Sequence, residues 1–231
     1  MNVNESNSKK QKWIGLNSDE VRDFYNHFGK KQDWQSFYEG PAIKELELYS
    51  EFQNAQAIFE LGSGTGQFAE KLLRSVLSKD CTYKGIDISS TMVDLSRKRL
   101  KHWSERVKID HKGLEGLAQE PPQFYDRFVS NYVFDLLSEE DIHLVVEQAR
   151  RILKINGRIC LVSLTNGNEG FSRLITYLWE KLFRFRAKWV GGCRPVKLIY
   201  YLDSEHWKLI HHGKVSSFGI PSEIVVAERI S

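Results

Sequence analysis

A glycine-rich stretch and two acids carry the chemistry that this sequence can be expected to perform. Three glycines alternate within residues 62–66, just after Glu60, which ends an apolar run, and an amphipathic segment, 67–77, follows them. This order predicts a strand, a tight turn and a helix, because glycine accepts positive φ and a helix N-terminus presents free N–H groups. Asp87 ends the next apolar run, where an acid can accept both hydroxyls of a ribose. We therefore expect a cofactor of the adenosine type.

Two spacings fit the glycine-rich stretch. Gly64-x-Gly66-x-x-Ala69 matches the dinucleotide fingerprint, whereas Glu60 begins an E-x-G-x-G-x-G pattern that resembles the loop of class I S-adenosylmethionine-dependent methyltransferases. Glu60 favours the second spacing, because a carboxylate repels a pyrophosphate, while S-adenosylmethionine (SAM) carries an ammonium and a sulfonium and no phosphate. An ordinary glycine turn in an unrelated α/β protein would show the same letters, so the loop alone does not decide.

Length and composition exclude several classes of protein. The chain has 231 residues, 41% of them hydrophobic, which suits one domain with appendages. Its net charge of +3 is weaker than a dedicated nucleic-acid binder needs, so no nucleic-acid partner is expected. The three cysteines form no C-x-x-C pair, and neither a metal site nor a disulfide framework is indicated. With no apolar secretory region after Met1 and no run of about 20 apolar residues, we expect a soluble, cytoplasmic protein.

The remaining pattern predicts the elements around the loop. Residues 1–12 have almost no apolar content and belong to a predicted disordered tail, 1–17, and residues 18–50 are predicted to form an aromatic-rich helical cap whose second helix opens at Pro41. Strands are predicted at 81–87 and 107–111, a strand with the turn after it at 124–137, and a further strand after a turn at 155–157, with helices at 91–101 and 139–153. Two last strands, 207–218 and 222–230, are joined by a Gly219-Ile220-Pro221 turn and are therefore antiparallel.

The order of these motifs resembles a class I methyltransferase over nearly the whole chain. The resemblance implies an α/β fold of one domain, 18–231: a Rossmann-like, seven-stranded, mostly parallel sheet with an antiparallel C-terminal hairpin, helices on both faces and an N-terminal helical cap. It also implies SAM as cofactor. The cofactor-binding residues that it implies are Glu60, Gly62, Ser63, Gly64, Gly66, Asp87, Ile88, Met92, Asn131 and, in place of an acid that the family often shows after strand three, Leu114 or Glu115.

Residues 166–201 interrupt the pattern and are expected to form an insertion on the substrate side. An apolar helix, 171–183, leads into a run of basic and aromatic residues, 181–194. This run would suit peripheral contact with an anionic membrane. The alternative is a helix that covers strand five and ends in a solvated basic face, which is the commoner use of a charge run.

The function expected from the resemblance is transfer of a methyl group from SAM to a small-molecule, quinone or lipid-like acceptor by in-line displacement. Strand four is not followed by the N/D-P-P-Y/W motif of amide or adenine N-methylation. If the acceptor needs a base, the candidate catalytic residues are Tyr25, His27 and Tyr132. Two alternatives stay open, an NAD-dependent oxidoreductase that uses the same loop and a non-catalytic SAM-binding protein. The acceptor and the oligomeric state cannot be read from the sequence.

Overall fold

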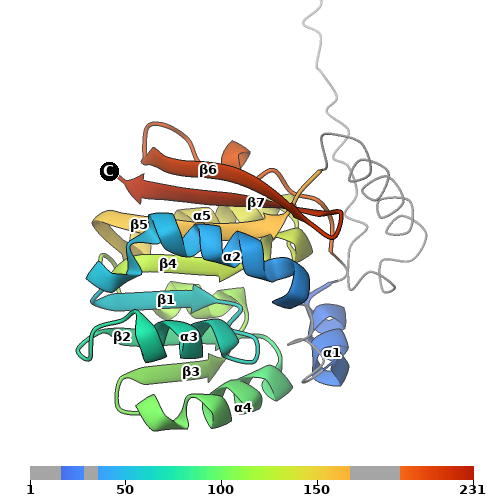
Figure 1. The fold of residues 1–231 in the computed structure, drawn as a ribbon, viewed down its shortest axis with the longest axis vertical. Helices are drawn as coiled ribbons and strands as arrows, with labels where there is room; N and C mark the ends of the chain where they lie inside the picture. The colour runs from blue at the N-terminus through green and yellow to red at the C-terminus, as the bar shows by residue number, and fades with distance from the viewer. Residues whose placement is uncertain (1–16, 29–35, 167–192) are drawn as a thin grey trace, which may run out of the picture.

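The computed structural model describes residues 17–28, 36–166 and 193–231 (Figure 1). The strands are β1 Ala57–Leu61, β2 Thr82–Asp87, β3 Val107–His111, β4 Tyr125–Asn131, β5 Leu153–Leu164, β6 Trp207–Ser217 and β7 Ile220–Arg229. The α-helices are α1 Ser18–Phe28, α2 Ser36–Ser50, α3 Gln67–Ser75, α4 Ser90–Arg99 and α5 Glu139–Ile152. Short 3₁₀ turns include η4 Leu114–Gln119 and η5 Phe134–Leu136.

The strands form one seven-stranded sheet in the order β3-β2-β1-β4-β5-β7-β6. Strands β1 to β5 are parallel, and β7 lies antiparallel between β5 and β6. Because β1 pairs with both β2 and β4, the chain reverses its direction of winding at β1, and ligands of such sheets bind at the carboxyl ends of the strands there. The predicted Rossmann-like sheet with its antiparallel C-terminal hairpin is confirmed.

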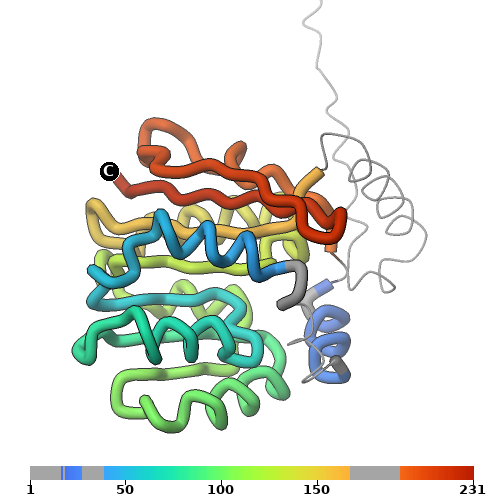
Figure 2. The backbone as a smooth tube through the Cα atoms, in the orientation of Figure 1, coloured from blue at the N-terminus to red at the C-terminus, as the bar shows by residue number. Residues whose placement is uncertain are grey.

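Helices cover both faces of the sheet and enclose two buried cores. One core lies under α5 and contains Phe59 and Phe128, and the other lies under α2, α3 and α4 and contains Ile58 and Tyr83. Neighbouring residues of β1 thus point into different cores, and all five residues of this strand are buried. The backbone trace places α1 at the carboxyl ends of the parallel strands (Figure 2), where its Asn26 Oδ1 accepts a hydrogen bond at 2.7 Å from the hydroxyl of Ser89, the residue before α4.

Two predicted boundaries are wrong. Helix α2 begins at Ser36, so Pro41 lies inside it. Proline lacks only the N–H that would reach the carbonyl four residues back, near the helix start, and α2 tolerates that loss. The hairpin turn is Phe218-Gly219, with φ of 52° and 81°, and Pro221 belongs to β7. Two positive φ angles suit a two-residue hairpin, because they match the twist of the paired strands.

The predicted insertion cannot be compared in full. Residues 171–183 and the basic positions up to 192 lie outside the described residues. Arg194 is described, and its guanidinium donates to the carbonyl oxygen of Leu137 at 3.0 Å. This side chain is therefore directed toward the start of α5.

Candidate functional site

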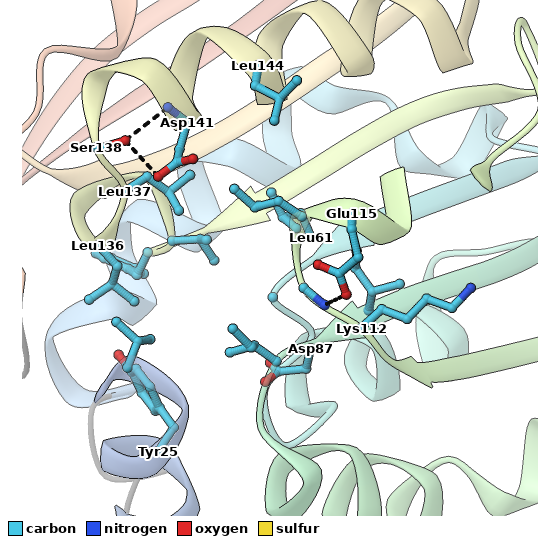
Figure 3. Close-up of a pocket in the computed structure, with 18 of the residues that line it drawn as sticks. Tyr25, Leu61, Asp87, Lys112, Glu115, Leu136, Leu137, Ser138, Asp141 and Leu144 are labelled. Carbon is cyan, nitrogen blue, oxygen red and sulfur yellow. Dashed lines mark hydrogen bonds between the residues drawn. The ribbon is translucent and has the colours of Figure 1, made fainter. Parts of the chain in front are cut away.

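Two cavities adjoin at the carboxyl ends of the parallel strands. The first has a volume of about 600 Å³ and lies between α1, the ends of β1 and β2, and the start of α5 (Figure 3). The second, of about 590 Å³, lies between α2, α3 and the glycine-rich loop. Four residues line both cavities: Tyr25, Gly62, Asn131 and Tyr132. We call the place where these four residues meet the junction.

The glycine-rich loop joins β1 to α3 with a backbone that other residues adopt with difficulty. Gly62, Gly64 and Gly66 have φ of 77°, 50° and 77°. A Cβ on Gly62 would overlap the side chain of Val133, and one on Gly66 would lie 2.5 Å from Ser96 Oγ. The pattern is thus required by the turn and by packing inside the protein, whatever ligand lies against the loop.

Asp87 lines the first cavity and also holds the loop. Its Oδ2 accepts a hydrogen bond from Gly64 N at 2.8 Å, and its Oδ1 accepts one from Ser89 N at 2.9 Å. Burial raises the pKa of Asp87, and the two backbone donors oppose this shift. An ionised carboxylate has about four acceptor positions, so two remain for ligand hydroxyls.

The other predicted cofactor residues surround the same cavity. Ile88 and the buried Met92 supply apolar surface, and Leu114 and Glu115 line the same cavity, where Figure 3 shows Glu115 near Lys112. Glu115 Oε1 accepts a hydrogen bond from Gly113 N at 2.8 Å. The structure therefore brings both candidates for the missing acid to the first cavity.

Glu60 lines the second cavity and is 2% exposed. Tyr83, on the neighbouring strand, donates its hydroxyl to Glu60 Oε2 at 2.8 Å. Burial raises the pKa of Glu60 to about 8, which the Tyr83 bond opposes and the charge of Asp87 reinforces. Sequence reasoning missed Tyr83, because nothing in a local pattern shows which side chain on β2 faces the acid. Ser63 lines this cavity too, and its buried Oγ has no partner among the described residues.

Asn131 and Tyr132 form the end of β4 at the junction. Both side-chain polar atoms of Asn131 are buried and have no hydrogen-bond partner in the part of the chain described here. Tyr132 has φ of 55°, a region that non-glycine residues rarely adopt. Its hydroxyl pairs with Ser222 Oγ at 2.9 Å, and burial raises the pKa of Tyr132. A phenol with a raised pKa is a poor base.

The two candidates on α1 differ in position. Tyr25 lines both cavities. His27 lines neither of them, and its Nδ1 lies 2.7 Å from the carbonyl oxygen of Asp23 on the exposed side of its own helix. The structure therefore does not bring His27 to the site.

Asp135, in η5, is a second buried acid that sequence reasoning missed. It is 1% exposed, and Ser163 Oγ donates to its Oδ1 at 3.2 Å. Burial raises the pKa of Asp135 to about 6.

No cluster of three or more histidine, cysteine or acidic side chains suited to a metal ion occurs within the described ranges. None of the described helices is long and apolar enough to cross a membrane.

Comparisons with known proteins identify the central part of the chain. Residues 58–157 match a family described as a methyltransferase domain. A demethylmenaquinone methyltransferase from Thermotoga maritima is 30% identical over 167 residues, which are 71% of this chain and 64% of that relative. The chain thus matches less than two thirds of the relative's length. A tRNA adenine-N6-methyltransferase from Trichodesmium erythraeum is 24% identical over 174 residues, 67% of this chain and 72% of its own.

Solved structures share the fold at low identity. A geranyl diphosphate methyltransferase solved with GPP and sinefungin aligns with a TM-score of 0.67 over 92% of this chain and 99% of that one. The two sequences are 9% identical. This likeness extends the methyltransferase fold beyond the matched family region to the C-terminal hairpin.

Proposed function

We propose that this chain, in which residues 58–157 form a class I SAM-dependent methyltransferase domain, methylates a small-molecule, quinone or lipid-like acceptor. The observation that carries the proposal is the division of two acids between adjoining cavities. Asp87 lies in the first cavity and Glu60 in the second, and Gly62 and Asn131 lie between them. SAM has a ribose at one end and an ammonium at the other, and each acid suits one end.

The residues that line the two cavities fit SAM, the methyl donor, in charge and shape. Asp87 would accept from the ribose hydroxyls, with Ile88 and Met92 against the adenine and Glu115 near its edge. Glu60 would face the ammonium, and the N-terminus of α3 lies beyond the loop. The sulfonium and its methyl group would then lie at the junction. Ser63, whose buried hydroxyl has no partner among the described residues, is a further candidate for the methionine end.

The protein's own contribution to the reaction is to position the partners and to exclude water. When bound, SAM would supply a methyl group that is already activated by its positive sulfur, for in-line displacement by the acceptor. Asp87 and Glu60 would hold its two ends, and Gly62 and Asn131 would lie against its middle. Fixed geometry of this kind can supply several kcal/mol of the barrier, roughly 7–11 in the most favourable cases.

Two observations support a small-molecule acceptor. A relative at 30% identity is named for a quinone precursor. Asn131 is followed by Tyr132 and Val133, without the two prolines of the adenine N-methylation motif. A peripheral membrane contact through 181–194 would suit a lipid-like acceptor, although Arg194 itself donates to Leu137.

We also propose a cytoplasmic location, because the cysteines form no disulfide among the described residues.

Calorimetric titration with SAM, S-adenosylhomocysteine (SAH) and NAD tests the cofactor. We expect binding of the first two and none of NAD, because an ammonium can ionise Glu60 and pair with it, whereas a pyrophosphate gains nothing from an acid at this place. Turnover of methyl-labelled SAM with a panel of naphthoquinols, phenols, amines and fatty acids then tests the reaction. Binding without transfer to any acceptor would favour the non-catalytic alternative, and tight binding of NAD would favour the oxidoreductase.

A further inference from the structure

Helix α1 lines the site although the two buried cores do not include it. Val21 and Tyr25 line the first cavity, as Figure 3 shows for Tyr25, and Tyr25 also lines the second. None of the described residues 19–27 is buried, and both cores are built from other elements. A helix of 11 residues is marginally stable by itself in water. The position of α1 at the cavity therefore depends on its contacts with neighbouring elements.

Asn26 supplies three such contacts, all with the start of α4. Its Oδ1 accepts a hydrogen bond from Ser89 Oγ at 2.7 Å and a longer one from Thr91 N at 3.4 Å. Its backbone carbonyl oxygen accepts from Thr91 Oγ1 at 3.3 Å. We call these three hydrogen bonds the latch. Asn26 is not among the residues that line the two cavities, so it acts on a ligand there through α1 or α4.

Ser89 joins the latch to the acid that is proposed to bind the ribose. The residue is completely buried, and its N–H donates to Asp87 Oδ1 at 2.9 Å. Its hydroxyl accepts from Met92 N at 3.2 Å and donates to Asn26. A serine hydroxyl has one hydrogen to donate, so losing the Asn26 oxygen would leave a buried donor unpaired. A continuous run of hydrogen bonds thus leads from α1 to Asp87.

We propose that Asn26 is a positioning residue, which holds α1 against the turn that carries Asp87 and thereby sets the rate at which the methyl donor leaves. The inference rests on the proposed function, since it takes the ribose to lie at Asp87. With the ribose there, Val21 and Tyr25 border the same cavity. The donor leaves when α1 moves away from α4, and the latch opposes that movement. A side chain outside the cavity therefore controls how long SAM, and SAH after the reaction, stay bound.

Hydrogen exchange of the unliganded full chain tests the latch without any ligand. The amides of residues 22–28 are followed, because the first four N–H groups of a helix have no partner within it. We expect Asn26→Ala to accelerate their exchange by about fivefold or more, the effect of losing a hydrogen bond to a buried group. Alanine is the better helix former, so the helix itself would not cause this change. Asp23→Ala, at an exposed position of the same helix, is the matched control and should not accelerate exchange.

Binding kinetics connect the latch with the donor. Surface plasmon resonance with SAH on immobilised protein gives the association and dissociation rates. Asn26→Ala should raise the dissociation rate by about fivefold or more without lowering the association rate, because the cavity itself is unchanged. Asn26→Asp keeps the side-chain acceptor and should dissociate within about twofold of the wild type, whereas Asn26→Leu, which lacks it, should behave like the alanine variant. Asp23→Ala should leave both rates unchanged.

A variant that does not fold has a substitute. If Asn26→Ala fails to fold, Thr91→Val takes its place, because it removes only the contact with the Asn26 carbonyl oxygen. The expected direction is the same in both measurements, faster exchange of 22–28 and faster release of SAH.

The inference is overturned if Asn26→Ala exchanges 22–28, or releases SAH, at the wild-type rate. It is also overturned if Asn26→Asp releases SAH as fast as Asn26→Ala, since the acceptor oxygen would then have no role. If the wild type binds neither SAM nor SAH, the proposed function itself fails and this inference fails with it. That result is distinguishable, because failure of the inference alone leaves wild-type binding of SAH intact.

Discussion

Asp87 acts on the loop as well as on the first cavity. Its carboxylate accepts from Gly64 N and Ser89 N, so it ties the glycine-rich loop to the start of α4. Removing it would therefore change both the ligand contacts and the geometry of the loop.

We predict that Asp87→Ala weakens SAM binding by about 1–3 kcal/mol, because ribose hydroxyls lose a charged acceptor. It should also lower the melting temperature of the unliganded protein, because the N–H of Gly64 loses its partner. Calorimetric titration and thermal unfolding measure the two effects. Asp94→Ala, at an exposed position on α4, is the control and should change neither. An unchanged Kd for SAM would remove Asp87 from the proposed site.

The protonation of Glu60 should change when the methyl donor binds. With its pKa raised to about 8 by burial, Glu60 is mostly neutral in the free protein near pH 7. An ammonium placed against it favours the carboxylate form. Binding of the donor should therefore release a proton.

We predict that SAM binding at about pH 6.5 releases close to one proton, since at that pH both Glu60 and an α-amino group hold their protons before binding. Titration in two buffers of different ionisation enthalpy gives the number of protons. Glu60→Gln should release none and bind more weakly. Equal proton release by the two proteins would show that Glu60 does not face the ammonium.

The turn between β1 and α3 depends on glycine both for its backbone conformation and for its packing. Gly62 has φ of 77°, and a Cβ there would overlap Val133. Gly40 on α2 is the contrasting case, since a Cβ there meets nothing within 4 Å outside its two chain neighbours. The same substitution should thus act more weakly at Gly40, where the new Cβ crowds only the adjacent Pro41.

We predict that Gly62→Ala lowers the free energy of unfolding by about 1–3 kcal/mol through strain and overlap. Gly40→Ala should change it by less than about 1 kcal/mol, because the gain from replacing a glycine inside a helix opposes the contact of the new Cβ with the Pro41 ring. Urea unfolding of the two variants beside the wild type measures both. Adding Val133→Ala to Gly62→Ala should recover the part that is due to overlap. A neutral Gly62→Ala would mean that the turn relaxes at no cost.

The elements that carry a local signal were predictable from the sequence. Strand β3 begins and ends at the predicted residues, 107 and 111, because its apolar alternation is bounded by polar turns on both sides. The helix predicted to begin at 139 does begin there, as α5, and Ser138 before it accepts a hydrogen bond through Oγ from Asp141 N at 3.1 Å. Such signals lie within a few residues of the element that they define.

The contacts that decide the chemistry were not predictable, because they join distant parts of the chain. Tyr83 and Glu60 lie 23 residues apart, and Tyr132 and Ser222 lie 90 apart. No local pattern specifies either pair, since each depends on strand register and on which face a side chain occupies. The position of the His27 ring was not predictable for the same reason, since the pattern indicates its helix but not the direction in which the ring points.

The whole molecule divides into a part that matches the methyltransferase family and a part that lies outside this match. The family match ends at residue 157, before most of β5 and the hairpin. Yet Ser222 on β7 anchors Tyr132 at the junction. The C-terminal hairpin, which lies outside the matched region, therefore helps to hold Tyr132 at the junction.

Buried acids at one edge of the sheet also make the stability of the whole molecule depend on pH. The pKa of Glu60 is raised from 4.5 to about 8, that of Asp135 from 3.8 to about 6, and that of Asp87 is raised as well. At pH values between the unfolded and the folded pKa of each acid, the folded state binds more protons than the unfolded state. The stability that these acids contribute is therefore fully present below about pH 4 and is lost as pH rises. Exposed acids with lowered pKa, such as Asp203, lose their contribution only at still lower pH.

We predict that the melting temperature of the unliganded protein falls as pH rises from about 5 to 9, because Glu60 and Asp135 must ionise while buried. Glu60→Gln, which keeps an acceptor for the Tyr83 hydroxyl, should remove the part of the fall centred near pH 8, and Asp135→Asn the part near pH 6. Saturating SAM should flatten the fall near pH 8 in the wild type, because its ammonium stabilises the Glu60 carboxylate. Calorimetric scans at several pH values, with and without SAM, measure these slopes. If the fall in melting temperature above pH 7 persists unchanged in Glu60→Gln, another group titrates there. If SAM flattens this fall equally in the wild type and in Glu60→Gln, SAM does not act through Glu60.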